Sequence, residues 1–236
     1  MINEVIYLQY ISSLLEGDKA KCASIVANFL EQKIDLKELY IDLFQRSLYQ
    51  VGKEWEKNKI CVATEHIATS ITECLINFAY PEIHSRKRNN NTRVVVTCAP
   101  KEFHQIGAKM VADLFEINGW ETYYVGANAP CGELFKLLKS KKPSLLAVSL
   151  TFYLNVLRLF DLIDKVQFEF PKLKIIVGGQ ALAGNKREVL NKYHNVKYIA
   201  TLNDLENYIL NQSKKLTVKL KNGRVHLIKN SGSMLE

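Results

Sequence analysis

The pair Glu102 and His104 combines the residue types and the spacing best suited to chemistry in this sequence. Imidazole is the most common side-chain ligand for metal ions in proteins. A metal-ligating histidine usually donates its second ring N–H to a carboxylate or a carbonyl, and Glu102 can supply that carboxylate. The pair therefore predicts a metal-ligating imidazole with a fixed tautomer. A loop histidine that caps a helix is the alternative interpretation.

The elements around this pair are predicted to place it at the edge of a parallel sheet. Residues 92–98 form an apolar, β-branched run that is typical of a buried strand. Apolar residues after His104 recur at helical spacing, so the histidine is expected in a strand-to-helix loop. In open α/β sheets, ligands bind in the crevice outside the carboxyl ends of the strands. The loop is therefore the expected place for a functional side chain.

Small residues are predicted at the carboxyl ends of two further strands. Ser149 and Thr151 end one apolar run, and Gly178 with Gly179 ends another. Glycine lets a ligand approach the backbone closely, and the hydroxyls of Ser and Thr can hydrogen-bond it. These residues predict a groove at the strand ends that admits a long substituent of a ligand.

The combined pattern resembles a known family. His104 is followed three residues later by Gly107, then by the Ser-x-Thr element at 149–151 and by the Gly-Gly pair at 178–179. The pattern resembles the cobalamin-binding domains of methionine synthase, corrinoid proteins and corrinoid-dependent mutases. The resemblance implies that His104 is the lower axial ligand of cobalt, in the base-off arrangement. It also implies that the nucleotide tail of cobalamin enters the groove near Ser149, Thr151, Gly178 and Gly179.

One position departs from this family. The family usually has Asp two residues before the histidine, whereas this chain has Glu102. Glutamate keeps the carboxylate at this position, and its longer side chain extends the reach of that group.

The sequence predicts two architectures joined by a linker. Up to residue 85, apolar residues recur at three-and-four spacing in four stretches, which indicates an antiparallel four-helix bundle. From residue 92 to 212, strands alternate with helices, which predicts a flavodoxin- or Rossmann-like five-stranded parallel sheet, and hence the α + α/β class. The strands are expected near 92–98, 121–126, 144–150, 174–179 and 197–200, and the helices near 105–118, 131–142, 154–167, 186–193 and 204–211.

The remaining segments of the chain are short. Residues 86–91 are the expected linker, because they are rich in Arg and Asn. Residues 213–230 are expected to form a hairpin tail around Asn222-Gly223. Residues 231–236 have the composition of a cloning remnant.

The bundle carries a second signature. Trp55 is followed, after nine residues, by Glu65-His66, and a turn near residues 57–60 would bring these side chains over one surface. Taken alone, Trp55 would be a core anchor and Glu65 a carboxylate favoured at a helix start. The spacing resembles the helical domain of adenosylcobalamin-dependent photoreceptor regulators of the CarH type. That resemblance implies that Trp55 covers the adenosyl group and that Glu65 and His66 contact the same side.

Two departures limit this resemblance. Glu56 occupies the position where the light-sensing regulators carry the histidine that captures cobalt after photolysis. Those regulators also begin with a MerR-type winged helix-turn-helix, whereas this chain begins with the bundle. Regulation would then act through a protein partner or through self-association.

The leading interpretation is a cobalamin-binding sensor, a photoreceptor that acts in transcription regulation. Adenosylcobalamin would lie between bundle and sheet, and light or a change of upper ligand would alter assembly or partner binding. The alternative is a corrinoid methyl carrier of a methyltransferase system, which would hold methylcobalamin. The question of enzyme or sensor thus stays open, as do a protein with a decayed cofactor site and haem binding through His104.

The composition of the chain limits the classes of binding partner that we expect. The formal net charge is +8, but the basic residues are spread over helix faces and concentrated in short runs such as 139–142, without interleaved aromatic residues. A solvated surface is therefore favoured over direct nucleic-acid binding. Neither an apolar run long enough to cross a membrane nor an N-terminal signal segment is present in the sequence, which predicts a cytoplasmic protein.

Overall fold

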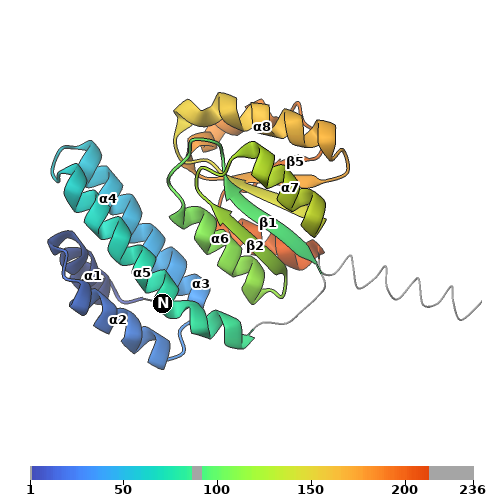
Figure 1. The fold of residues 1–236 in the computed structure, drawn as a ribbon. Helices are drawn as coiled ribbons and strands as arrows, with labels where there is room; N and C mark the ends of the chain where they lie inside the picture. Colours follow the sequence, from blue (N-terminus) through green and yellow to red (C-terminus); the bar gives the residue numbers. More distant parts are fainter. Residues whose placement is uncertain (1, 87–91, 213–236) are drawn as a thin grey trace, which may run out of the picture.

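The computed structural model describes residues 2–86 and 92–212, with the backbone alone for residues 84–86. The expected hairpin at 213–230 and the expected remnant at 231–236 lie outside the described residues, as does most of the expected linker. An N-terminal group of helices stands beside a five-stranded sheet, as Figure 1 shows. The helical segments of the N-terminal part are α1 (Glu4–Glu16), α2 (Lys19–Glu31), α3 (Leu36–Glu38), η1 (Leu39–Gln45), α4 (Arg46–Glu56) and α5 (Val62–Arg86).

Helix boundaries in the bundle follow local capping chemistry. The side chains of Asn3, Asp18 and Asp35 each accept a hydrogen bond from a backbone N–H in the first turn of α1, α2 and α3. Gly17 ends α1 in the left-handed conformation, at φ 76°. Helices α1, α2 and α4 all pack against α5. The predicted bundle of four helical rods is confirmed, because α3, η1 and α4 follow one another without a break.

The middle of the third rod is not α-helical. Leu39–Gln45 forms a π-helix, which apolar spacing alone does not predict. Its side chains Tyr40 and Phe44 are buried, and the Tyr40 hydroxyl donates a hydrogen bond of 2.9 Å to Asp113 in the sheet domain. The irregular turns therefore contribute a buried polar contact between the two parts of the chain.

The second part of the chain is the predicted parallel sheet. Its strands run in the order β2-β1-β3-β4-β5, and every neighbouring pair is parallel. The strands are β1 (Arg93–Cys98), β2 (Glu121–Gly126), β3 (Leu145–Ser149), β4 (Lys174–Gly178) and β5 (Val196–Tyr198). From β1 the chain continues to β2 on one side of β1, and from β2 it crosses back to β3 on the other side. The crevice between β1 and β3 is therefore the topological switch point, where ligands bind in such sheets.

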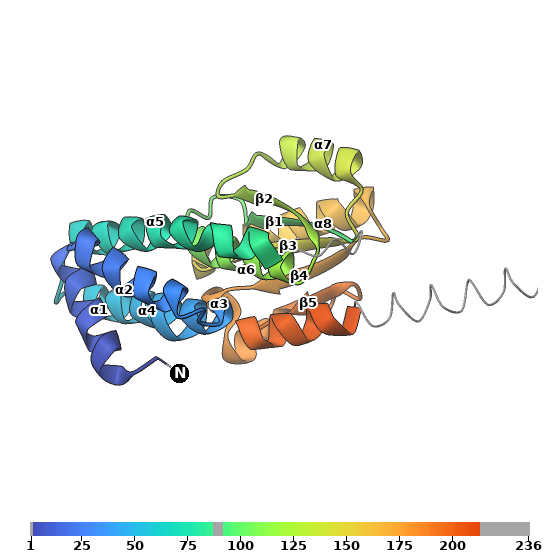
Figure 2. The same cartoon turned by 90° about the horizontal axis from the view of Figure 1, so that it is seen from below.

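Helices cover both faces of the sheet, as Figure 2 shows. Alternate residues of the strands pack into two separate cores, because successive side chains of a strand point to opposite faces. Helices α7 (Cys131–Lys141) and α8 (Val156–Glu169) cover one face, whereas α6 (Ile106–Ile117) and the last helix, over residues 202–212, cover the other. Three short 3₁₀ segments complete the domain: η2 (Tyr153–Asn155), η3 (Gln180–Leu182) and η4 (Gly184–Leu190). The helix predicted near 186–193 is therefore wrong, since that stretch contains the 3₁₀ segment η4.

The bundle and the sheet domain share a hydrophobic core. One continuous cluster of buried residues extends from the bundle through α6 to the strand residues beneath it. Helices α5 and α6 pack side by side. Further hydrogen bonds join the bundle to the sheet domain beside that of Tyr40: Lys37 donates to Glu206 at 2.6 Å, Tyr80 donates to Glu116 at 3.1 Å, and Gln105 donates to Glu73 at 2.8 Å. These contacts determine which end of the bundle faces the carboxyl edge of the sheet.

No helix among the described residues combines the length and the apolar character that a membrane crossing requires.

Gly179 provides a test of the sheet's backbone packing. A Cβ added there would lie 2.2 Å from the Leu150 carbonyl oxygen, and the residue has φ 101°. We expect Gly179→Ala to lower the free energy of unfolding by about 2 kcal/mol or more, measured by urea denaturation. Gly132→Ala is the matched control, because no atom lies within 4 Å of its added Cβ. The free energy of unfolding of the Gly132→Ala variant should stay unchanged or rise. Equal stability of both variants would contradict the packing described here.

Candidate cofactor-binding site

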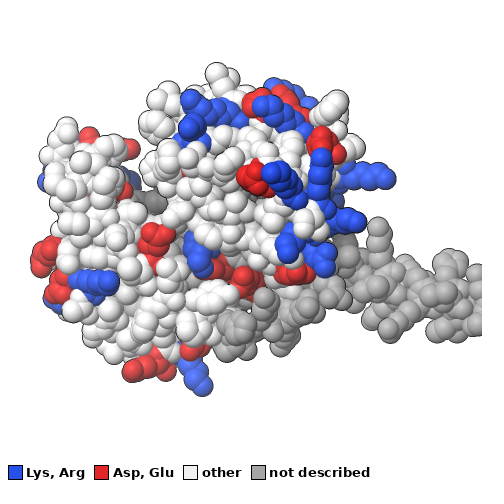
Figure 3. Space-filling model, in the orientation of Figure 1, with Lys and Arg blue, Asp and Glu red and all other residues white. Residues whose placement is uncertain are grey.

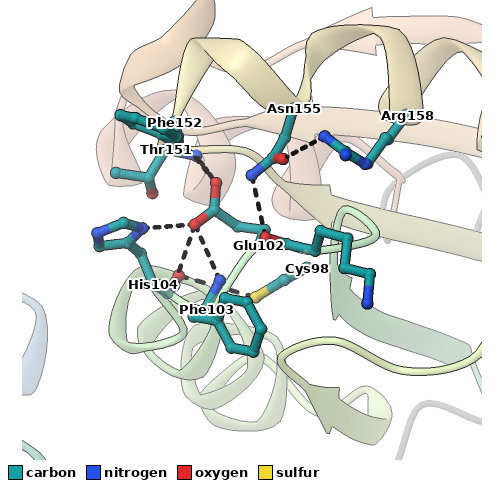
Figure 4. Close-up of polar contacts among 9 residues, drawn as sticks. Cys98, Glu102, Phe103, His104, Thr151, Phe152, Asn155 and Arg158 are labelled. Atoms are coloured by element: carbon teal, nitrogen blue, oxygen red, sulfur yellow. Dashed lines mark hydrogen bonds and ion pairs between the residues drawn. The ribbon is translucent and has the colours of Figure 1, made fainter.

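The carboxylate of Glu102 is the centre of the candidate site, and Figure 4 shows its contacts. The residue is buried in the loop after β1. Its Oε1 accepts hydrogen bonds from the backbone N–H groups of Phe103 and His104, both at 3.1 Å, and from His104 Nδ1 at 2.5 Å. Its Oε2 accepts from the backbone N–H groups of Thr151, at 3.0 Å, and Phe152, at 2.8 Å. One side chain thus joins the loop after β1 to the loop after β3.

These contacts keep Glu102 ionised. Burial by itself would raise the pKa of this carboxyl group, but the hydrogen bonds from His104 and from the backbone of Phe152 and His104 outweigh burial and lower the pKa to about 2. A buried carboxylate is tolerated only where several donors replace its water. The loop after β3 supplies two of these donors.

His104 is held by one ring nitrogen and presents the other. Its Nδ1 pairs with Glu102, while the side chain is 59% exposed and points away from the sheet in Figure 4. The bond to Glu102 raises the pKa of His104, partial burial opposes this rise, and the charges of Glu102 and Glu65 add to it. A carboxylate at Nδ1 favours the tautomer whose Nε2 carries the lone pair, which is the form that binds a metal.

The predicted small residues gather beside this imidazole. Ser149 ends β3, where it pairs in register with Cys98 of β1 and Gly178 of β4. Gly107 lies in the first turn of α6, and an added Cβ would lie 4.0 Å from the Ser149 hydroxyl oxygen. The backbone N–H of Thr151 is already used by Glu102. The structure therefore places these residues along one edge of the sheet, together with His104.

Gly179 has a structural reason to be glycine. Its positive φ and its close approach to the backbone of Leu150 exclude a side chain whether or not a ligand is bound. Gly179, one of the small residues that predicted a groove, is thus also required by the packing of the backbone around it.

The bundle residues of the second signature lie at the end of the bundle where α4 meets α5. Trp55 is in the last turn of α4 and is 48% exposed. Glu65 is in the first turn of α5, where its carboxylate accepts from Thr69 at 2.9 Å and contacts His66 Nδ1 at 2.6 Å. His66 itself is turned largely to solvent. Helix α5 is joined to the loop that carries His104 by the hydrogen bond from Gln105 to Glu73, at 2.8 Å.

A hollow separates this end of the bundle from the sheet domain, as Figure 3 shows. Large apolar side chains are exposed near His104 on the sheet side, which is unusual for a surface in contact with water only. They are Phe103, Phe152, Tyr153, Leu154 and Leu157. A large, partly apolar ligand fits such surroundings.

Sequence reasoning missed several residues that support the site. The buried Asn155 donates to the Lys101 carbonyl oxygen at 3.1 Å and thereby braces the loop that carries Glu102. Gln105, next to His104, donates to Glu73 of α5 at 2.8 Å. A weak signal existed for Glu73, which lies on the same face of α5 as Glu65, eight residues earlier. Nothing in the local sequence around Asn155 identifies its partner.

The donor set indicates the kind of metal group that fits. One exposed imidazole can occupy one axial position of a metal whose other positions are supplied by a macrocycle. Within residues 2–83 and 92–212, no group of three or more His, Cys, Asp or Glu side chains is arranged to hold a metal ion. The site therefore fits a metal cofactor with its own ligands.

Comparison with known proteins agrees with this geometry. A family model described as a B12 binding domain matches residues 92–201, and a second B12 binding domain model matches residues 7–77. Trimethylamine corrinoid protein 1 of Methanosarcina mazei is 22% identical over 170 residues, which cover 71% of this chain and 76% of that protein. Trimethylamine corrinoid protein 2 of the same organism is 22% identical over 178 residues, covering 71% and 79%.

A solved structure shares the fold. The monomethylamine corrinoid protein of Methanosarcina barkeri superposes with a TM-score of 0.77 at 15% identity, covering 89% of this chain and 99% of that one. The match covers bundle and sheet together, so the two-part architecture described above is an established protein fold.

The Glu102 contacts predict a specific pH dependence of stability. The folded pKa of about 2 lies below the ordinary value of 4.5, so the stabilisation is complete above pH 4.5 and is lost as the pH falls toward 2. We expect Glu102→Gln to remove this acid-sensitive part, on the order of 2 kcal/mol, from unfolding free energies measured between pH 2 and pH 7. Glu133→Gln, at an exposed position of α7, is the control and should keep it. Identical pH profiles for Glu102→Gln and the wild-type chain would refute this account.

Proposed function

The chain belongs to the B12-binding domain family, whose two models cover its bundle and its sheet domain, and we propose that it is a corrinoid methyl carrier. The observation that carries the proposal is the similarity to the trimethylamine corrinoid proteins, which extends over 71% of the chain. In this function, a methyl group would pass between a methylated substrate and an acceptor through two protein partners. The form of the cofactor that we propose is methylcobalamin.

The carboxyl edge of the sheet would hold the cofactor from below. Bound cobalamin would supply a cobalt able to accept and release a methyl group. His104 would ligate the cobalt through Nε2, and Glu102 would orient the imidazole and increase its basicity through the 2.5 Å contact at Nδ1. The groove beside Gly107, Ser149, Thr151, Gly178 and Gly179 would receive the nucleotide tail. The exposed lone-pair nitrogen and the small residues at the strand ends support this assignment.

The end of the bundle would cover the cofactor from above. Trp55, Glu65 and His66 lie there, and α5 is joined to the loop of His104 by the hydrogen bond from Gln105 to Glu73. A reactive cobalt–methyl bond needs protection from water, whichever partner later receives the methyl group. We therefore propose that these three residues form the upper wall of the site and that a methyltransferase partner gains access when the bundle moves away.

The leading interpretation from the sequence was a light-dependent sensor, and the comparisons favour the alternative. The relatives that match along both domains are named as trimethylamine and monomethylamine corrinoid proteins. Glu56 also replaces the histidine on which light-driven capture depends. The photoreceptor and transcription-regulation roles thus have no support beyond the spacing of Trp55 and Glu65-His66.

Electron paramagnetic resonance of the cob(II)alamin form tests the lower ligand. The protein is labelled with nitrogen-15 and loaded with unlabelled cobalamin. Coordination by His104 predicts a doublet splitting, because the nitrogen-15 nucleus has two spin states, whereas the cofactor's own base would give a triplet. We expect His104→Ala to abolish the doublet, while His66→Ala keeps it. A triplet in the wild-type protein would exclude the proposed ligation.

Separate experiments distinguish the carrier from the sensor. We expect the methyl-loaded protein to lose its methyl group to a thiol acceptor only in the presence of a methyltransferase partner, followed by absorption spectroscopy. Light should leave the oligomeric state of the adenosyl-loaded protein unchanged in sizing chromatography. A light-dependent change of assembly, together with no partner-dependent demethylation, would restore the sensor interpretation.

A further inference from the structure

A second cavity opens at the amino ends of the strands, the opposite edge of the sheet from His104. Its volume is about 440 Å³, which lies within the size range of small-molecule sites, roughly 300 to 1,000 Å³. We call it the amino-edge pocket. It is lined by Thr92, Arg93, Trp120, Lys142, Ser144, Lys174, Tyr208 and Gln212, among which there are three cations and no carboxylate.

The sheet register brings the three cations together. Arg93 is the first residue of β1, and the backbone N–H of Ser144 donates to its carbonyl oxygen at 3.0 Å. Lys174 begins β4 and pairs with Leu145, the first residue of β3. Lys142 directly follows α7, shortly before β3. Three separate segments thus present basic side chains at neighbouring strand starts, and one of them contains the basic run 139–142 that the cofactor site does not use.

The charges in the amino-edge pocket are incompletely neutralised. Arg93 Nε donates to Glu121 at 2.8 Å, whereas Lys174 Nζ donates, among the described residues, to the neutral amide of Gln212 alone, at 3.2 Å. Lys142 has no ion pair within the described part of the chain. Lys and Arg side chains also gather over this region, near the end of α7 and the beginning of β1, in Figure 3. Neighbouring cations repel one another, so a bound anion would stabilise this arrangement.

One side chain that lines the pocket carries an unpartnered polar atom. Trp120 is 2% exposed, and its indole Nε1 has no hydrogen-bond acceptor among the described residues. Buried donors in folded proteins are nearly always paired, so an unpaired one indicates a missing acceptor.

We propose that the amino-edge pocket binds a small organic anion that carries a phosphate group. The phosphate would contact Lys142, Lys174 and Arg93, because ammonium and guanidinium groups both suit its oxygens. The organic part would lie against Trp120 and Tyr208, which are aromatic. The pocket shares no residue with the cofactor site, so this inference does not rest on the proposed function.

The two tryptophans of the chain make a direct test possible. The nitrogen-15 correlation spectrum contains one indole signal from Trp55 and one from Trp120, which Trp55→Phe assigns. We expect adenosine 5′-monophosphate, added at constant ionic strength to the full chain, to shift the Trp120 signal saturably. Inorganic phosphate should bind more weakly, because it lacks the part that contacts the aromatic side chains.

Charge variants show whether the shift comes from the pocket. Lys142→Gln combined with Lys174→Gln should raise the dissociation constant for adenosine 5′-monophosphate about tenfold or more. Lys142→Arg combined with Lys174→Arg keeps both charges and should bind nearly as tightly as the wild type. Lys19→Gln with Lys21→Gln, on exposed positions of α2, is the control of equal charge change and should have no effect. An unmoved Trp120 signal, an equal affinity of the Gln double variant, or binding of nucleic-acid oligomers only would each overturn the proposal.

Discussion

The ionised carboxylate of Glu102 is the constraint on which the carboxyl edge of the sheet depends. A buried charge costs free energy unless hydrogen bonds replace its water, and here the imidazole and four backbone N–H groups do so. Two of these N–H groups belong to the loop after β3. The charge therefore connects the loops that follow β1 and β3, the two strands that border the switch point of the sheet. The same oxygen that accepts from the loop backbone also orients His104. Structural order in the loop and the ligating capacity of the imidazole therefore have one physical cause.

The position of the bundle depends on a different kind of contact. The hydrophobic cluster that runs from the bundle through α6 joins the two domains along one side, and the Tyr40–Asp113 hydrogen bond lies buried within this contact. On the other side, a hollow separates the ends of α4 and α5 from the sheet domain. A cap that is firmly packed at one end and open at the other can shield a cofactor and still admit a partner. The π-helical turns that carry Tyr40 are one place where such a movement would change the domain contact.

The parallel sheet presents two chemically different edges. At the carboxyl edge, small residues and exposed apolar side chains surround a single imidazole. At the amino edge, Arg93, Lys142 and Lys174 converge beside a buried indole. Parallel strands separate these edges completely, because every strand begins at one and ends at the other. A ligand at the amino edge would therefore leave the carboxyl edge unobstructed.

The sequence by itself determined the elements and the identity of the candidate ligand. Helical spacing, capping residues and β-branched runs act over a few neighbouring residues, so the bundle, the five strands and the loop of His104 and Glu102 could be predicted from local patterns. Only the tertiary structure decided which groups Glu102 binds in the loop after β3, why Gly179 excludes a side chain, and that Gln105 meets Glu73. It also decided the 3₁₀ turns at 184–190 and the π-helix at 39–45. These features depend on strand register and on packing between segments far apart in the chain, which local periodicity does not encode.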